Sequence, residues 1–264
     1  MNPELLYVAS LLAKMLVTGL IVITASIITE RVGPLIGALV ITLPITTGPA
    51  YVFLALDHDA AFLAKTALGG LSANAVNAVF FVIYTLMAQR HGLFGSLSLA
   101  TLGWIAIIPL VQAHDWTLAQ GVLLNVIVFG SGIFIVRRFR DAPVPYVKRE
   151  WYDIPFRAVL IALLVGAVVG LSATLGPWVT GALSVYPVAM TSAALILHNR
   201  IGGPALAALF ANGLSGLLGF IFSLSVVHLT IVPLGIPLSL TLALIAAMSW
   251  NIFVWLTRRG GWPI

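Results

Sequence analysis

The sequence contains no cysteine, and this absence excludes disulfides, thiolate metal sites and cysteine nucleophiles. Its five histidines are scattered, and no two are spaced four residues apart like the paired ligands of a helical metal site. Neither Ser72 nor Ser215 has a histidine near it in the sequence. We therefore expect no metal, no cofactor and no enzymatic activity, and an intramembrane enzyme is the weakest of three hypotheses.

Charge is scarce as well. Charged residues make up 8% of the 264 residues and hydrophobic residues 61%, whereas soluble domains are about a quarter charged. So few charges cannot cover a water-facing surface, and the mean hydropathy of +1.10 favours lipid as the main solvent. The net charge is +5, but the basic residues lie between hydrophobic segments. This pattern is typical of membrane orientation and not of nucleic-acid binding.

The hydrophobic segments are long and continuous, which predicts helices, because about 20 apolar residues are needed to cross a bilayer. We predict an all-α polytopic membrane protein with about nine transmembrane helices at residues 5–29, 33–56, 60–88, 93–112, 117–136, 154–175, 177–197, 204–227 and 234–257. Residues 228–237 stay open between the start of a helix, a re-entrant turn and an interfacial loop.

Basic residues end every second predicted helix. They are Arg31, Arg90, Arg137, Arg138, Arg140, Arg200, Arg258 and Arg259. The other loops carry Asp57, Asp59 and Asp115 and no lysine or arginine. Because cytoplasmic loops are enriched in lysine and arginine, we predict an N-terminus outside and a C-terminus in the cytoplasm.

One short pattern occurs twice. "VGPLIGALVITLP" at residues 32–44 resembles "LGPWVTGALSVYP" at residues 175–187, with Gly-Pro at the start and proline at the end of each. The offset of 143 residues holds without gaps from position 33 to position 72, where ten residues are identical. The chain therefore reads as a first repeat at 1–136, a basic cytoplasmic linker at 137–153 and a second repeat at 154–264.

The first repeat holds one helix more than the second, so the two copies cross the membrane in opposite directions. Inverted repeats of this kind are typical of secondary transporters. A duplication that merely built a larger bundle is the alternative.

Pro44 and Pro187 lie about ten residues into predicted helices two and seven, which is about 15 Å along a helix and close to the bilayer midplane. Each proline frees backbone polar groups, which are tolerated in a membrane only inside protein or beside a cavity. We predict that these proline-broken helices form a substrate site, although plain kinks are the alternative.

Other polar residues in the apolar segments complete the predicted site. Lys14 and Arg157 each lie 30 residues before one of the prolines, and they would attract an anion unless they extend to the headgroups instead. The full set of substrate-binding candidates is Lys14, Arg157, Pro44, Thr46, Thr47, Pro187, Tyr186, Thr191, Asn74, Asn77, Asn212 and Ser215. For the three asparagines and Ser215, hydrogen bonding between helices is the alternative role.

Each half resembles the GlpM-like family of small bacterial inner-membrane proteins, in which an early lysine precedes a proline-containing segment by a fixed interval. The segments that carry the resemblance are "GALVITLP" and "GALSVYP", with Lys14 and Arg157 at the basic position. This chain departs from the family in joining two copies, in having arginine in the second, and in lacking the first motif proline. The resemblance implies a bacterial inner membrane and little about chemistry.

The leading hypothesis is a secondary transporter of a small anionic or amphiphilic metabolite that works by alternating access. The alternative is a non-transporting membrane protein, either a scaffold, an assembly subunit or a lipid-handling protein. The expected partners are membrane lipid and a small-molecule substrate, with no nucleic acid, and a homo-oligomer stays open.

Overall fold

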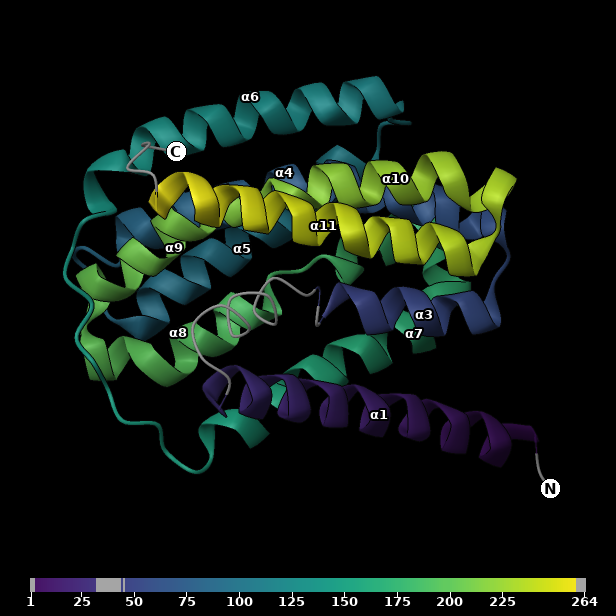
Figure 1. Cartoon of the computed structure of the whole chain (residues 1–264), viewed down its shortest axis with the longest axis horizontal. Coiled ribbons are helices and arrows are strands. Elements are labelled where there is room, and N and C mark those ends of the chain that lie inside the picture. The colour runs from purple at the N-terminus through teal and green to yellow at the C-terminus, as the bar shows by residue number, and fades with distance from the viewer. Residues whose placement is uncertain (1–2, 32–43, 45, 260–264) are drawn as a thin grey trace.

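The computed structural model describes residues 3–31, 44 and 46–259, and every regular element in these ranges is helical. The elements are α1 (Pro3–Arg31), α3 (Thr47–Asp57), α4 (Ala60–Met87), α5 (Leu93–Gln112), α6 (Leu118–Val136), the short 3₁₀ helix η1 (Arg137–Phe139), α7 (Asp153–Ser184), α8 (Val188–Ile201), α9 (Gly203–Leu217), α10 (Gly219–Leu234) and α11 (Ile236–Arg259) (Figure 1). The prediction of an all-α chain is confirmed for this part of it.

Seven stretches of the described chain are long and apolar enough to cross a membrane: α1, α4, α5, the α6 region, α7, α9 with α10, and α11. They indicate a multi-pass membrane protein. Helices α3 and α8 are shorter, with 11 and 14 residues, and both follow a proline of the repeated pattern. The first part of predicted helix two, residues 33–43, lies outside the described residues.

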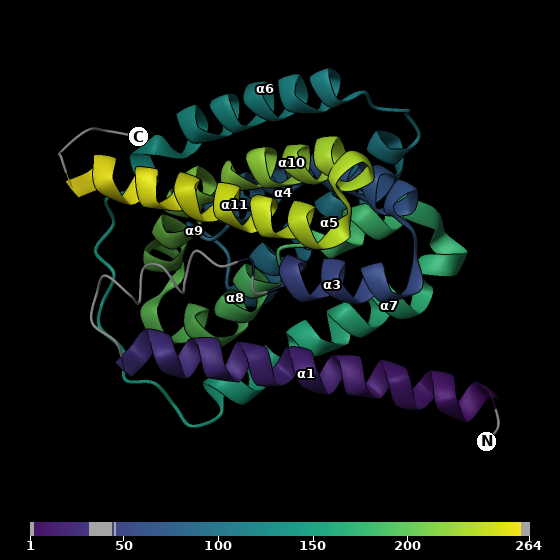
Figure 2. The same cartoon turned by 45° about the vertical axis from the view of Figure 1, so that its right-hand side comes forward.

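Helix α4 is the centre of the bundle. In its most apolar 18-residue window 83% of residues are buried, compared with 17% in α1 and in α11, and the two cartoon views place it behind α10 and α11 (Figures 1 and 2). Glycines allow another helix to approach it closely, because a Cβ at Gly181 would overlap the carbonyl oxygen of Thr66. A Cβ at Gly69 of α4 would likewise overlap the carbonyl oxygen of Trp178, so small residues on both helices allow the close packing.

The chain turns sharply inside α7. Gly176 has φ +73° and ψ 172°, a conformation that only glycine adopts readily. The turn divides α7 into residues 153–175, which pack on α1, and residues 177–184, which pack on α4. The predicted boundary between helices six and seven at Gly176 is confirmed.

Predicted helix seven is interrupted where expected. Helix α7 ends at Ser184, Pro187 precedes the first residue of α8, and α8 continues to Ile201. In the first repeat α3 begins at Thr47, three residues after Pro44. Both prolines thus stand just before a short helix.

The predicted end of helix eight at residue 227 is wrong. Two helices, α9 and α10, meet at Leu218, and α10 continues through Pro233 to Leu234. Gly235, with φ +80°, makes the turn into α11. Residues 228–237 are therefore helical apart from this glycine, because a positive φ and not the proline ends the helix.

Candidate functional site

A cavity of about 630 Å³ lies where the two proline-containing segments meet. Six of the predicted site residues line it: Pro44, Thr46, Thr47, Arg157, Tyr186 and Pro187. The rest of the described wall comes from Ser26 of α1, Phe81 of α4, the linker and the first turn of α7, and also from α8, the junction of α9 and α10, and α11. Segments 143 residues apart in the sequence therefore share one cavity.

One end of the cavity is rich in positive charge. Lys148, Arg149, Arg157 and Arg200 line it together with a single carboxylate, Asp153. Arg200 donates to both Asp153 oxygens at 2.8 Å, and it also donates to the Tyr152 hydroxyl at 2.7 Å. The hydrogen bond to Asp153 raises the pKa of Arg200 above its usual value. Arg200 thus engages the carboxylate, and Arg157 and Lys148 add positive charge to the described lining at this end.

Arg157 stands in the wall one helical turn after Asp153. Its side chain is half-buried, and its guanidinium has no hydrogen-bond partner among the described residues. A guanidinium carries five donors, and none of those of Arg157 is both fully buried and unpaired, so they are accessible from the cavity. The arrangement suits an anion, because carboxylate and phosphate oxygens match the guanidinium fork.

The other end of the cavity is apolar. Val185, Ala189, Met190 and Phe220 line it, and the Tyr186 ring stands edge-on to Trp104 with centroids 5.0 Å apart. The cavity therefore changes from charged to apolar along its length.

Side chains of α3 and α4 donate to the two carbonyls exposed by the break between α7 and α8. Thr47 donates to the carbonyl of Ser184 at 3.1 Å, and Asn77 donates to the carbonyl of Val185 at 2.7 Å. Trp104 in turn donates to the Asn77 side-chain oxygen at 2.8 Å. Asn77 is buried behind the cavity wall, so it positions the break and does not line the cavity.

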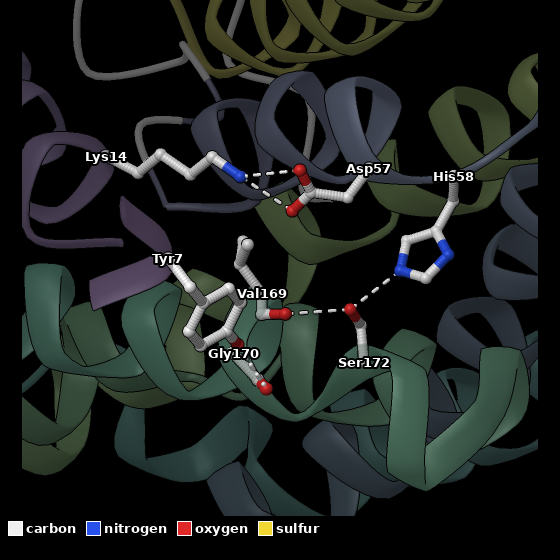
Figure 3. Close-up of polar contacts among 7 residues, drawn as sticks. All are labelled: Tyr7, Lys14, Asp57, His58, Val169, Gly170 and Ser172. Carbon is white, nitrogen blue, oxygen red and sulfur yellow. Dashed lines mark hydrogen bonds and ion pairs between the residues drawn. The ribbon is translucent and has the colours of Figure 1, made fainter. Parts of the chain in front are cut away.

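Lys14 lies outside the cavity, in a polar network that joins α1, α3 and α7 (Figure 3). Its ammonium donates to both oxygens of Asp57 at 2.6 and 2.7 Å. Close by, His58 Nε2 lies 2.7 Å from the Ser172 hydroxyl. That hydroxyl donates its proton to the Val169 carbonyl, so it accepts from His58 and places a proton on Nε2.

The remaining site candidates form hydrogen bonds with other residues of the protein. Asn74 donates to Asn125 at 2.9 Å and so joins α4 to α6. Asn212 donates to the Arg140 carbonyl, and Ser215 accepts from the Arg140 guanidinium at 2.7 Å. These two residues hold the linker on α9. Thr191 lies 3.4 Å from the Tyr186 hydroxyl, to which it donates.

Sequence reasoning missed Arg200, Lys148 and Arg149 as cavity residues, because basic residues between the apolar segments were interpreted only as signals of orientation. Asp153 was not considered at all. The 143-residue offset offered a clue, since Arg200 aligns with Asp57 and Arg157 with Lys14. The part of the chain that the structure describes has no group of three histidine, aspartate or glutamate residues able to hold a metal.

Comparisons with known proteins add no further constraint. No protein-family model, curated protein sequence or solved structure matches the chain. The resemblance to GlpM-like proteins stays a prediction, and function has to be argued from the cavity itself.

Proposed function

We propose that the protein is a secondary transporter of a small anionic or amphiphilic metabolite, built from two inverted halves that work by alternating access. The observation that carries the proposal is the single cavity lined by both proline segments and by Arg157. Transporters place substrate at such a repeat interface, beside discontinuous helices. We further propose a bacterial inner-membrane location, with the basic linker in the cytoplasm.

Backbone details recur between the halves and support a duplication. The amide of Gly48 donates to the Pro44 carbonyl at 2.7 Å, and the amide of Thr191 donates to the Pro187 carbonyl at 2.9 Å. Donor and acceptor are each shifted by 143 residues. Helices α4 and α9 also begin 143 residues apart.

The packing of corresponding helices supports opposite directions in the two halves. Tyr7 contacts Gly170, and Met15, later in α1, lies against Gly166, earlier in α7. These helices are therefore antiparallel. The same holds for α4 against α9 and α10, where Ala64 contacts His228 and Ala88 lies against Gly203.

The two ends of the molecule differ in the way alternating access requires. The cavity reaches the basic linker at Lys148 and Arg149, the side that the positive-inside rule assigns to the cytoplasm. At the opposite end Lys14 and Asp57 form an ion pair between α1 and α3. In this proposal the structure is an inward-facing state whose outer side is held closed.

The test is uptake of radiolabelled anions into proteoliposomes, with a panel of small carboxylates and phosphates. We expect saturable uptake of at least one anion, and an uptake rate reduced at least tenfold in Arg157→Gln. Arg138→Gln is the matched control, because Arg138 is exposed and its guanidinium packs on Phe139 outside the cavity. No flux across the panel would favour the scaffold hypothesis. Equal uptake by Arg157→Gln and wild type would refute Arg157 as a substrate-binding residue.

A further inference from the structure

An apolar groove adjoins the cavity on the side away from the linker. It has a volume of about 260 Å³ and lies between α3, α10 and α11, which neighbour one another in both cartoon views (Figures 1 and 2). Its wall includes Tyr51 of α3, Leu224 of α10 and Leu244 of α11. Among the residues that the structure describes, the groove wall contains no lysine, arginine, aspartate or glutamate.

Groove and cavity adjoin each other. Pro44, Thr47 and Phe220 line both of them. From Phe220 the groove follows α10 past Leu224 to Val227, at i, i+4 and i+7 on one helix face. Seven residues of helix extend about 10 Å, so the groove is long enough for several methylene groups beyond the cavity.

Cavity and groove share these three wall residues, and every charged side chain in their described lining belongs to the cavity. Arg157, Arg200, Lys148 and Arg149 surround the charged end of the cavity, and aliphatic and aromatic side chains surround the groove. A small hydrophilic anion would fill the charged end and leave the groove unused. A neutral lipid would leave the guanidinium of Arg157 without a partner.

We propose that the ligand is a single-chain amphiphile whose anionic head binds Arg157 and whose alkyl tail passes between Pro44 and Pro187 into the groove. This inference rests on the proposed function and narrows its substrate class. Burying one methylene is worth about 0.8 kcal/mol, which is about fourfold in Kd. Affinity is expected to rise by about that factor per methylene until the tail fills the groove, and then to stop rising.

The experiment is calorimetric titration of the purified full-length protein in amphipol with methyl, butyl, hexyl and octyl phosphate, after subtraction of a blank titration into amphipol alone. Ser223→Trp fills the groove without touching the cavity, since Ser223 lines only the groove. Thr241→Trp does the same from α11. The matched control is Leu229→Trp, on the lipid-facing side of α10.

In the two groove variants we expect affinity to stop rising at a shorter alkyl chain, because only the apolar end of the cavity is left for the tail. Methyl phosphate binding should be unchanged in them, and Leu229→Trp should behave as wild type. Arg157→Gln should weaken every phosphate by a similar factor. Equal affinity for methyl and octyl phosphate in wild type, or an unchanged chain-length effect in both groove variants, would overturn the amphiphile inference while leaving an anion site. If Arg157→Gln bound all four alkyl phosphates with wild-type affinity, the proposed function would be overturned as well.

Discussion

The ion pair between Lys14 and Asp57 gives the sharpest test of alternating access. Lys14 is 12% exposed and Asp57 38% exposed, so the pair is partly screened by solvent. Pairs of this kind contribute about 0.2–1 kcal/mol, and partial burial places this one near 1 kcal/mol. If the pair forms in the inward-facing state and not in the outward-facing state, Asp57→Asn should raise the ratio of outward-facing to inward-facing protein about fivefold.

The assay uses the absence of cysteine from the chain. A single cysteine replaces Met190, which lines the cavity, and a membrane-impermeant maleimide is added to one face of the membrane at a time. We expect labelling from the linker side in the wild-type background. In Asp57→Asn, labelling from the opposite side should rise about fivefold, as estimated above from the strength of a partly exposed pair.

Two further variants make the result decisive. Asp115→Asn removes an exposed carboxylate outside this network and should leave labelling unchanged. Exchanging the two charges, with Lys14→Asp and Asp57→Lys together, should return labelling toward the wild-type pattern. Equal labelling in Asp57→Asn and wild type would refute the role of the pair in holding the outer side closed.

Two variants test how the break and the central helix are held. Gly181→Ala should lower the free energy of unfolding by about 1–3 kcal/mol, because the new methyl group overlaps the backbone of α4. The control is Gly130→Ala, which has open space around its Cβ and should be neutral or slightly stabilising. Both free energies are measured by unfolding in SDS. Asn77→Leu should cost about 1–3 kcal/mol in the same assay, since it leaves the Val185 carbonyl and the Trp104 N–H without partners. A stability of Gly181→Ala equal to that of Gly130→Ala, or of Asn77→Leu equal to wild type, would contradict the close packing or the support of the break.

Much of the fold could be predicted because its signals are local. The prediction for residues 93–112 coincides with α5, and α6 begins at Leu118 after a capping box of Thr117 and Gln120. Gly176 and Pro187 marked the turn and the break because few other residues serve there. The end of α10 was missed because a proline in the last turn of a helix looks, in sequence, like its terminator.

The site was only partly predictable, because its partners are distant in the sequence. The repeat brought Arg157, Pro44 and Pro187 into one hypothesis, and they line one cavity. Asn77 donates to the carbonyl of Val185, 108 residues away, which is available as an acceptor only because the helix is broken there. Lys14 has its partner 43 residues on, at Asp57, and no spacing rule links the two before the helices are packed.

The hydrogen bonds at the break also determine which parts of the protein can move together. Residues 177–184 belong to the second repeat by sequence, yet they are fastened to the first, through Thr47, through Asn77 and through the close approach of Gly181 to α4. Residues 153–175 meet them at Gly176, with its positive φ, and pack on α1, while Ser172 contacts His58. In the proposed motion residues 177–184 therefore move with the first repeat, although the sequence pattern places them in the second.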